Sequence, residues 1–202
     1  LGLIECKYIE LFEYDTECNL SSLNNLLYDN LSLFFECVCC AYKAESEKNK
    51  PISLTSEEKK LAKKAHSILY KWIKLESRIE SDDAFGKWFD CVIWHAKRVD
   101  RLNIVLEILG SKLFHVKSNE VCGFLSKAVV KILENPNAEF LHRGYTIEAF
   151  NSRGVHWYSE DDDEMRYDDY YKKFLLLSES GYNYTSNLYK KIAEDVRRDN
   201  GI

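Results

Sequence analysis

Two histidines and a nearby acidic run are the side chains best suited to chemistry in this sequence. His142 and His156 precede a run that includes Asp161 and Asp163. Imidazole and carboxylate are suitable ligands for zinc or manganese, and a metal held by these four residues would make the protein a metal-dependent phosphoesterase or nuclease. Their spacing contains no tight local ligand pair of the kind that metal hydrolases usually show. We therefore keep metal hydrolysis as an alternative and expect no cofactor.

The cysteines do not complete a catalytic or metal-binding pattern. Most of the seven stand among apolar residues, where a thiol behaves as a small buried hydrophobe, and this usage is typical of a reducing compartment. Cys37 and Cys40 would share one helix face, but the sequence has no second CxxC pair to complete a zinc site. Glycine motifs that bind phosphate or present a nucleophile are also missing from the sequence. The residues favour a binding protein over an enzyme.

A second group of residues near the end of the chain is typical of protein interfaces. Arg153, Trp157 and Tyr158 lie in a stretch without helical spacing, and Arg143 lies a short distance before them. Arginine, tryptophan and tyrosine often anchor protein–protein contacts. A glycine follows each of the two arginines and permits backbone turns that other residues resist. We expect these residues to bind a partner protein or a neighbouring part of a longer chain.

The densest positive strip of the chain lies on one face of an amphipathic pattern that follows Thr55. Its lysines are Lys59, Lys60, Lys63, Lys64, Lys71 and Lys74. Such a strip could bind nucleic-acid phosphates with a strong dependence on salt concentration. It lacks the interleaved arginines and aromatic residues of a nucleic-acid site, and the formal net charge of the chain is −5. We expect a solvated face and keep nucleic-acid binding as a second alternative.

Apolar residues at helical spacing account for the first half of the chain. A stripe with intervals of three and four predicts a helix over residues 22–44, ended by the polar stretch before Pro51. Thr55 and Glu58 have the spacing of a capping box, in which side chains and backbone cap each other at a helix start. A second helix is therefore predicted to begin there.

A longer stripe predicts one helix over residues 82–109, with Gly110 as its left-handed C-terminal cap. Trp94 and His95 lie at the edge of this stripe, where we expect the two rings to be partly buried together.

Capping residues define the helices predicted for the second half of the chain. Ser118 is expected to cap a helix that stops at Asn135 and Pro136. The acids of residues 160–164 suit the N-terminus of a helix that ends near Gly181. Thr185 is expected to cap the last helix.

The expected fold is all-α. No stretch alternates convincingly between apolar and polar residues as a half-buried strand would, and the chain has only two prolines and eight glycines. Antiparallel helix pairs of this length form either a short α-solenoid, as in HEAT-like repeats, or an irregular helical bundle. We expect a helical-pair body over residues 1–135 and a C-terminal segment over residues 136–202, a loop plus two helices, packed on that body as one domain.

The sequence gives no sign of membrane insertion or export. No apolar run reaches the roughly 20 residues that a membrane span requires, and the N-terminus lacks the features of a signal peptide. We therefore expect a cytoplasmic protein without membrane or nucleic-acid partners.

The residues from Arg153 to Asp199 also carry a resemblance. They combine Arg-Gly-Val-His, an acidic patch, an aromatic helix, a Thr-Ser start and Leu-x-x-x-Ile-Ala. This arrangement resembles the tail that ends certain long, helix-rich bacterial proteins of uncharacterised function. The resemblance implies that the chain is the C-terminal part of a larger protein. We expect a non-catalytic subunit or scaffold of a cytosolic bacterial assembly, bound to a protein partner, to its parent chain or to a second copy of itself.

Overall fold

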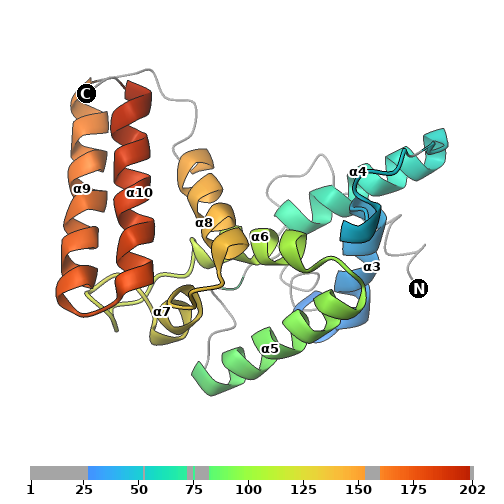
Figure 1. The fold of residues 1–202 in the computed structure, drawn as a ribbon, viewed down its shortest axis with the longest axis horizontal. Helices are drawn as coiled ribbons and strands as arrows, with labels where there is room; N and C mark the ends of the chain where they lie inside the picture. Colours follow the sequence, from blue (N-terminus) through green and yellow to red (C-terminus); the bar gives the residue numbers. More distant parts are fainter. Residues whose placement is uncertain (1–26, 52, 72–74, 76–81, 153–159, 201–202) are drawn as a thin grey trace. The chain divides into compact units, whose positions relative to one another are not determined.

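The regular structure of the protein is helical. The computed structural model describes residues 27–51, 53–71, 75, 82–152 and 160–200 (Figure 1). Within these ranges every regular element is a helix, and a lone β-bridge joins Val121 to Leu125. The all-α prediction is confirmed, whereas the choice between a short solenoid and an irregular bundle stays a prediction.

The chain divides into two compact units. One contains residues 1–74 and 89–105, and the other contains residues 75–88 and 106–202. The chain therefore passes from one unit to the other within helix α5 (Asp82–Arg98) and again within helix α6 (Leu102–Leu113).

In the first unit, helix α3 (Leu31–Ala41) packs along helix α4 (Ser56–Lys71). Phe34 and Val38 are buried on α3, and Leu69 is buried on α4. The Asn30 side chain caps α3 by accepting a hydrogen bond from the backbone N–H of Leu33 at 3.3 Å. This cap interrupts the helix that was predicted over residues 22–44.

The start of α4 follows the prediction. The Thr55 hydroxyl accepts from the backbone N–H of Glu58 at 3.2 Å, and the Glu58 carboxylate accepts from the backbone N–H of Thr55 at 2.8 Å. These bonds form the reciprocal capping box. They also hold the pKa of the Glu58 carboxyl below its usual value.

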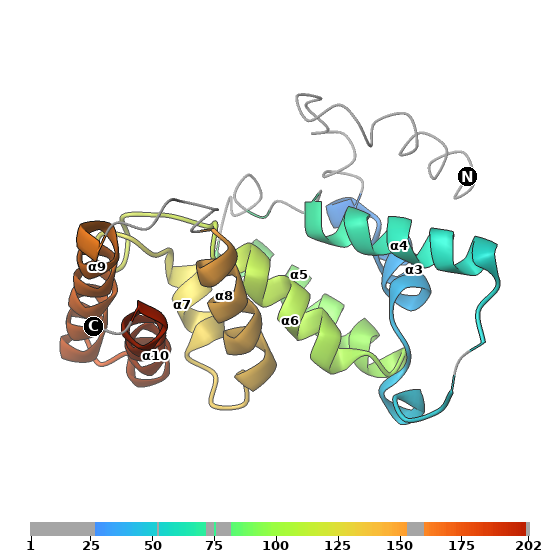
Figure 2. The same cartoon turned by 90° about the horizontal axis from the view of Figure 1, so that it is seen from above.

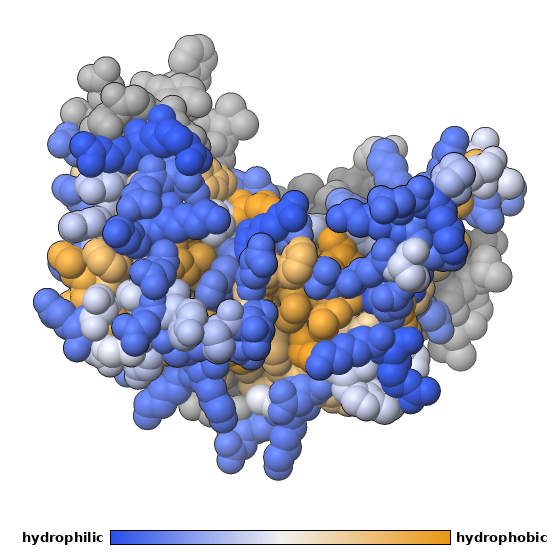
Figure 3. Space-filling view, viewed as in Figure 1, coloured by the Kyte–Doolittle hydropathy of each residue, from blue (hydrophilic) through white to orange (hydrophobic). Residues whose placement is uncertain are grey.

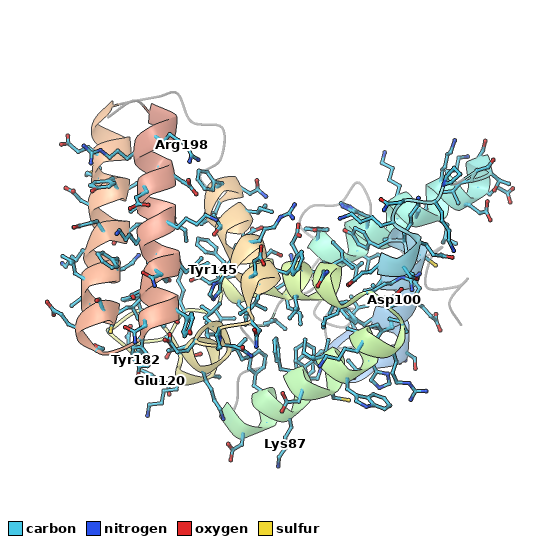
Figure 4. The ribbon with its side chains drawn as sticks, viewed as in Figure 1. Lys87, Asp100, Glu120, Tyr145, Tyr182 and Arg198 are labelled. Atoms are coloured by element: carbon cyan, nitrogen blue, oxygen red, sulfur yellow. The ribbon has the colours of Figure 1, made fainter. Side chains whose placement is uncertain are left out.

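The stripe predicted to be one helix over residues 82–109 forms two. After α5 the chain turns at Asp100, which has a left-handed φ of 55°, and α6 then begins at Leu102 (Figure 4). The short 3₁₀ helix η1 (Glu45–Glu47) holds this turn. The backbone N–H of Glu45 donates to the Asp100 carbonyl at 2.8 Å, and that of Ser46 donates to the Asp100 carboxylate at 2.9 Å. The prediction failed because a distant segment, rather than the local sequence, supplies the partners of the turn.

The N-terminus of α6 is capped by the same segment. The Glu45 carboxylate accepts from the backbone N–H of Asn103 at 2.6 Å and from the Asn103 side-chain amide at 3.1 Å. A carboxylate at a helix N-terminus satisfies an orphan donor and interacts favourably with the helix dipole. Glu45 thus does for α6 what Thr55 does for α4.

The second unit contains helices α7 (Lys127–Leu133), α8 (Glu139–Asn151), α9 (Glu160–Glu179) and α10 (Asn183–Asn200). α9 and α10 form an antiparallel hairpin and lie side by side in both views (Figures 1 and 2). The hairpin turns at Gly181, whose φ is +83°, where the sequence predicted the end of α9. α10 also packs on α8, and there the Tyr145 and Tyr189 hydroxyls share a buried hydrogen bond of 2.6 Å.

Two helix starts in this unit differ from the prediction. Ser118 caps no helix, because α7 begins only at Lys127, where Ser126 accepts from the backbone N–H of Val129 at 3.1 Å. Thr185 lies inside the first turn of α10. The Glu134 carboxylate accepts from the backbone N–H and the hydroxyl of Thr185, at 3.0 and 2.8 Å. A side chain from the end of α7 therefore caps α10.

Gly110 and Gly144 lie inside helices and form neither a cap nor a turn. A Cβ at Gly110 would overlap the Leu141 carbonyl oxygen of α8, and a Cβ at Gly144 would overlap the Glu107 carbonyl oxygen of α6. Each glycine thus faces the backbone of the other helix. The expectations of a cap at 110 and a turn at 144 are wrong, because both glycines permit a close approach of α6 and α8.

Candidate functional site

Most of the residues predicted to bind a partner lie outside the described residues: Arg153, Trp157 and Tyr158. Arg143 lies on α8, where its guanidinium Nε is 3.5 Å from the Glu107 carboxylate of α6. Its side chain keeps 63% of its surface exposed in this pair. Because the Arg143 partner is largely exposed, the pair contributes at most about 1 kcal/mol to stability. Arg143 is accessible, and its role in binding a partner stays a prediction.

The residues of the metal alternative are only partly described. His156 and the side chains of Asp161 and Asp163 lie outside the described residues. His142 donates through Nε2 to the Leu133 carbonyl at 2.7 Å, and burial lowers its pKa. This bond leaves only Nδ1 of His142 for a ligand. Within the described part of the chain no group of three or more His, Cys, Asp or Glu side chains could hold a metal ion. The metal site stays a prediction.

The lysine strip follows the outer side of α4. Lys59, Lys60 and Lys63 are exposed and Lys64 is half-buried. Lys74 and the side chain of Lys71 lie outside the described residues. The large apolar side chain exposed on this helix is Leu61, at 41%. An aliphatic side chain does not offer the stacking surface on which aromatic residues bind bases. Nucleic-acid binding stays a prediction.

The structure brings together one acid–base pair that the sequence did not reveal. His115 Nε2 lies 2.7 Å from a Glu148 carboxylate oxygen and joins the end of α6 to α8. The two residues are 33 positions apart in the sequence, so no local spacing predicts the pair. Phe114 packs edge-on against the His115 ring, and the pair links two elements of the core. We interpret this pair as a structural contact.

A row of acidic and apolar side chains follows one face of α9. Glu164, Asp168, Tyr171, Leu175 and Glu179 recur at intervals of three and four, and all are exposed. Tyr171 and Leu175 keep 39% and 44% of their surface accessible. Hydrophobic side chains reach the surface over α9 in Figure 3. We call these residues the α9 row.

The α9 row is exposed because the other side of the helix already packs on α10. Leu177 is fully buried, and the Tyr170 ring lies 6.1 Å from the Tyr189 ring of α10. The run from Phe174 to Leu177 contains four consecutive apolar residues, and one helix face cannot accommodate all of them. This run is the sequence signal that could have revealed the row.

A second exposed aromatic group lies on α5. Trp94 keeps 53% of its surface accessible, which makes it one of the most exposed apolar side chains among the described residues. The Arg98 guanidinium lies 4.6 Å from the centre of the Trp94 ring, in cation–π geometry. The His95 ring meets Trp94 edge-on and Phe35 of α3 on its other side. His95 thus anchors this turn of α5 to the core while Trp94 faces solvent.

Comparisons with protein-family models, with curated proteins and with solved structures found no match. Among the described residues, no helix is both long enough and apolar enough to cross a membrane.

Proposed function

We propose that this protein acts by binding another protein, as a non-catalytic subunit or scaffold of a larger assembly, and that the α9 row is its binding surface. One observation carries the proposal: Tyr171 and Leu175 are exposed on an ordered helix and are bracketed by carboxylates. Aromatic side chains at the centre of a patch with charged residues at its rim are typical of protein interfaces.

The chemistry of the row selects the class of partner. Contact of Tyr171 and Leu175 with apolar side chains lowers the free energy of the complex, because burying apolar surface contributes about 25 cal/mol per Å². Asp168 and the flanking Glu164 and Glu179 favour cations and raise the rate of encounter with a basic surface. The row runs straight along the helix over about 22 Å, at 1.5 Å per residue. A basic amphipathic helix lying along α9 meets all three requirements.

The cysteines support a reducing compartment for this association. Among the described residues Cys39 and Cys91 are exposed free thiols. An oxidising environment tends to pair exposed thiols, so these two residues support a reducing compartment. We therefore propose the cytoplasm as the site of action.

Binding of a labelled amphipathic helical peptide of leucine and lysine tests the proposed surface. Fluorescence anisotropy should show saturable binding to the wild-type protein that weakens as the salt concentration rises. Leu175→Ser and Tyr171→Ser should each weaken binding at least tenfold, because each removes apolar contact area from the centre of the row.

Ile147→Ser is the matched control, since Ile147 is an aliphatic residue of α8 with 38% exposure, close to that of Tyr171. It should leave the affinity unchanged. A peptide of leucine and glutamate with the same spacing should not bind. Equal loss in the Ile147 and Leu175 variants, or no saturable binding at all, would overturn the α9 row as a protein-binding surface.

A native mass spectrum at pH 7, recorded with and without a chelator, tests the metal alternative on the same sample. The proposal predicts that the chelator leaves the mass unchanged. A chelator-sensitive extra mass of one metal ion would favour the metalloenzyme instead.

A further inference from the structure

We propose that the basic helix bound by the α9 row is α5 of a second copy of this chain; this inference rests on the proposed function. α5 presents Cys91, Trp94, Lys97 and Arg98 to solvent, and all are exposed. They combine an aromatic anchor with positive charge, whereas the α9 row combines apolar side chains with negative charge. The chain therefore carries both halves of a complementary pair.

The spacing of the two groups also agrees. Cys91 and Arg98 are separated by two helical turns, with Trp94 between them, and Leu175 and Asp168 are separated by the same distance, with Tyr171 between them. At 1.5 Å per residue both separations are about 10.5 Å. In an antiparallel pairing Arg98 lies opposite Asp168 while Cys91 lies opposite Leu175. The apolar residues then meet next to the charged pair.

The antiparallel direction is favoured by the charges around these groups. Lys97 and Arg98 lie in the last turn of α5, and Glu164 and Asp168 lie in the first half of α9. The same register places Lys172, the exposed cation next to the row, opposite Trp94, where an ammonium group is attracted to the indole face. A parallel pairing of the two groups would place Arg98 opposite Leu175 and away from Asp168.

The anchor on α5 is held in place before association. Arg98 already lies over the Trp94 ring, and His95 fixes the same turn of the helix to Phe35. A side chain that is ordered in the free protein loses less conformational entropy on binding. Tryptophan and arginine are also the residues whose truncation most often abolishes a protein–protein contact.

Each copy offers one α5 group and one α9 row. Copies therefore associate either as a reciprocal dimer that contains the contact twice, or head to tail into a ring or an open chain. The average mass in solution should therefore rise with protein concentration and fall with added salt.

Sedimentation velocity over a range of concentrations tests the inference by charge reversal. Arg98→Glu and Asp168→Arg should each weaken self-association at least tenfold, because each places like charges opposite one another. The variant with both changes should regain self-association. An equimolar mixture of the two single variants should also associate. Lys131→Glu, an exposed charge reversal on α7, is the control and should self-associate like the wild type.

The outcomes separate this inference from the proposed function. Arg98→Glu leaves the α9 row intact, so it should bind the leucine–lysine peptide as the wild type does. In one outcome, the wild-type chain stays monomeric at every concentration and still binds the peptide. This result would overturn the inference that the partner is a second copy, and it would leave the proposed function standing. Failure of the double variant to regain association overturns the pairing of Arg98 with Asp168. Circular dichroism confirms that each variant is folded.

Discussion

Helices α4 and α6 begin in different ways. The cap of α4 is local, because Thr55 and Glu58 bond to each other across three residues. The cap of α6 is imported, because the Glu45 carboxylate reaches Asn103 from 58 residues away. A local cap exists as soon as its own turn forms, whereas an imported cap exists only when the tertiary structure has formed.

The same difference separates the interiors of these two helices. α4 has no glycine, and its apolar stripe packs through side chains such as Leu69. α6 contains Gly110, which packs through its backbone against α8. Local interactions thus define α4, while α6 depends on partners at both its start and its middle. Mutations that remove imported contacts should therefore cost more than mutations that remove local ones.

The largest expected effect is that of Gly110→Ala. The new methyl group would overlap the Leu141 carbonyl oxygen, and backbone cannot move aside as a flexible side chain can. We expect a loss of about 3 kcal/mol in the free energy of unfolding, measured by urea denaturation. Gly86→Ala is the control. A Cβ there meets nothing within 4 Å, so this change should stabilise α5 by about 0.5–1 kcal/mol. An unchanged free energy of unfolding in Gly110→Ala would refute the close approach of α6 and α8.

The next largest effect should be that of Glu134→Ala at the start of α10. Thr185 is fully buried, and the change leaves its backbone N–H and hydroxyl without their acceptor. The expected loss is about 2–3 kcal/mol, since unsatisfied buried donors cost roughly 1–3 kcal/mol each. The melting temperature of Glu134→Ala is compared with that of Glu139→Ala, a control at an exposed glutamate. Equal melting temperatures for the two variants would contradict the imported cap.

Glu45→Ala removes the imported cap of α6 at a half-buried position. We expect a loss of about 1–2 kcal/mol, the upper part of the range for helix caps. Hydrogen exchange should accelerate at Asn103 and also at Ser46, because the turn at Asp100 and the start of α6 share one set of contacts. Acceleration at Asn103 alone would show that the two contacts are independent.

Thr55→Ala should have a smaller effect that stays within α4. The loss of an exposed threonine cap costs about 1 kcal/mol. Hydrogen exchange should accelerate only in the first turn of α4, and Thr55→Ser should restore protection because its hydroxyl can make the same bond. Spread of the effect to α6 would remove the distinction between local and imported caps.

The smallest effect concerns pH. Burial lowers the pKa of His142 below its ordinary value of about 6.5 in the unfolded chain. As the pH falls below about 6.5, the unfolded chain binds a proton that the folded chain resists, so the free energy of unfolding decreases. His142→Gln should flatten this decrease between about pH 7 and 5. Equal slopes in the wild type and in His142→Gln would contradict the assignment.

The candidate site was only partly visible in the sequence. The residues expected to bind a partner included Arg143, which is exposed. The α9 row was not recognised, because Tyr171 and the other tyrosines of α9 also fit an inward stripe. Four consecutive apolar residues up to Leu177 could have indicated a second apolar face. The exposure of Trp94 could not have been inferred, because it depends on how far α3 covers α5.

The sequence by itself determined the all-α class, the capping box at Thr55 and the turn at Gly181. These features depend on intervals of three and four residues and on local hydrogen bonds, which act between neighbours in the chain. The tertiary structure decided the break at Asp100, the caps supplied by Glu45 and Glu134, and the use of Gly110 as a crossing point. Each of these depends on a partner brought close by folding, and a periodic pattern contains no information about which distant residue that partner is.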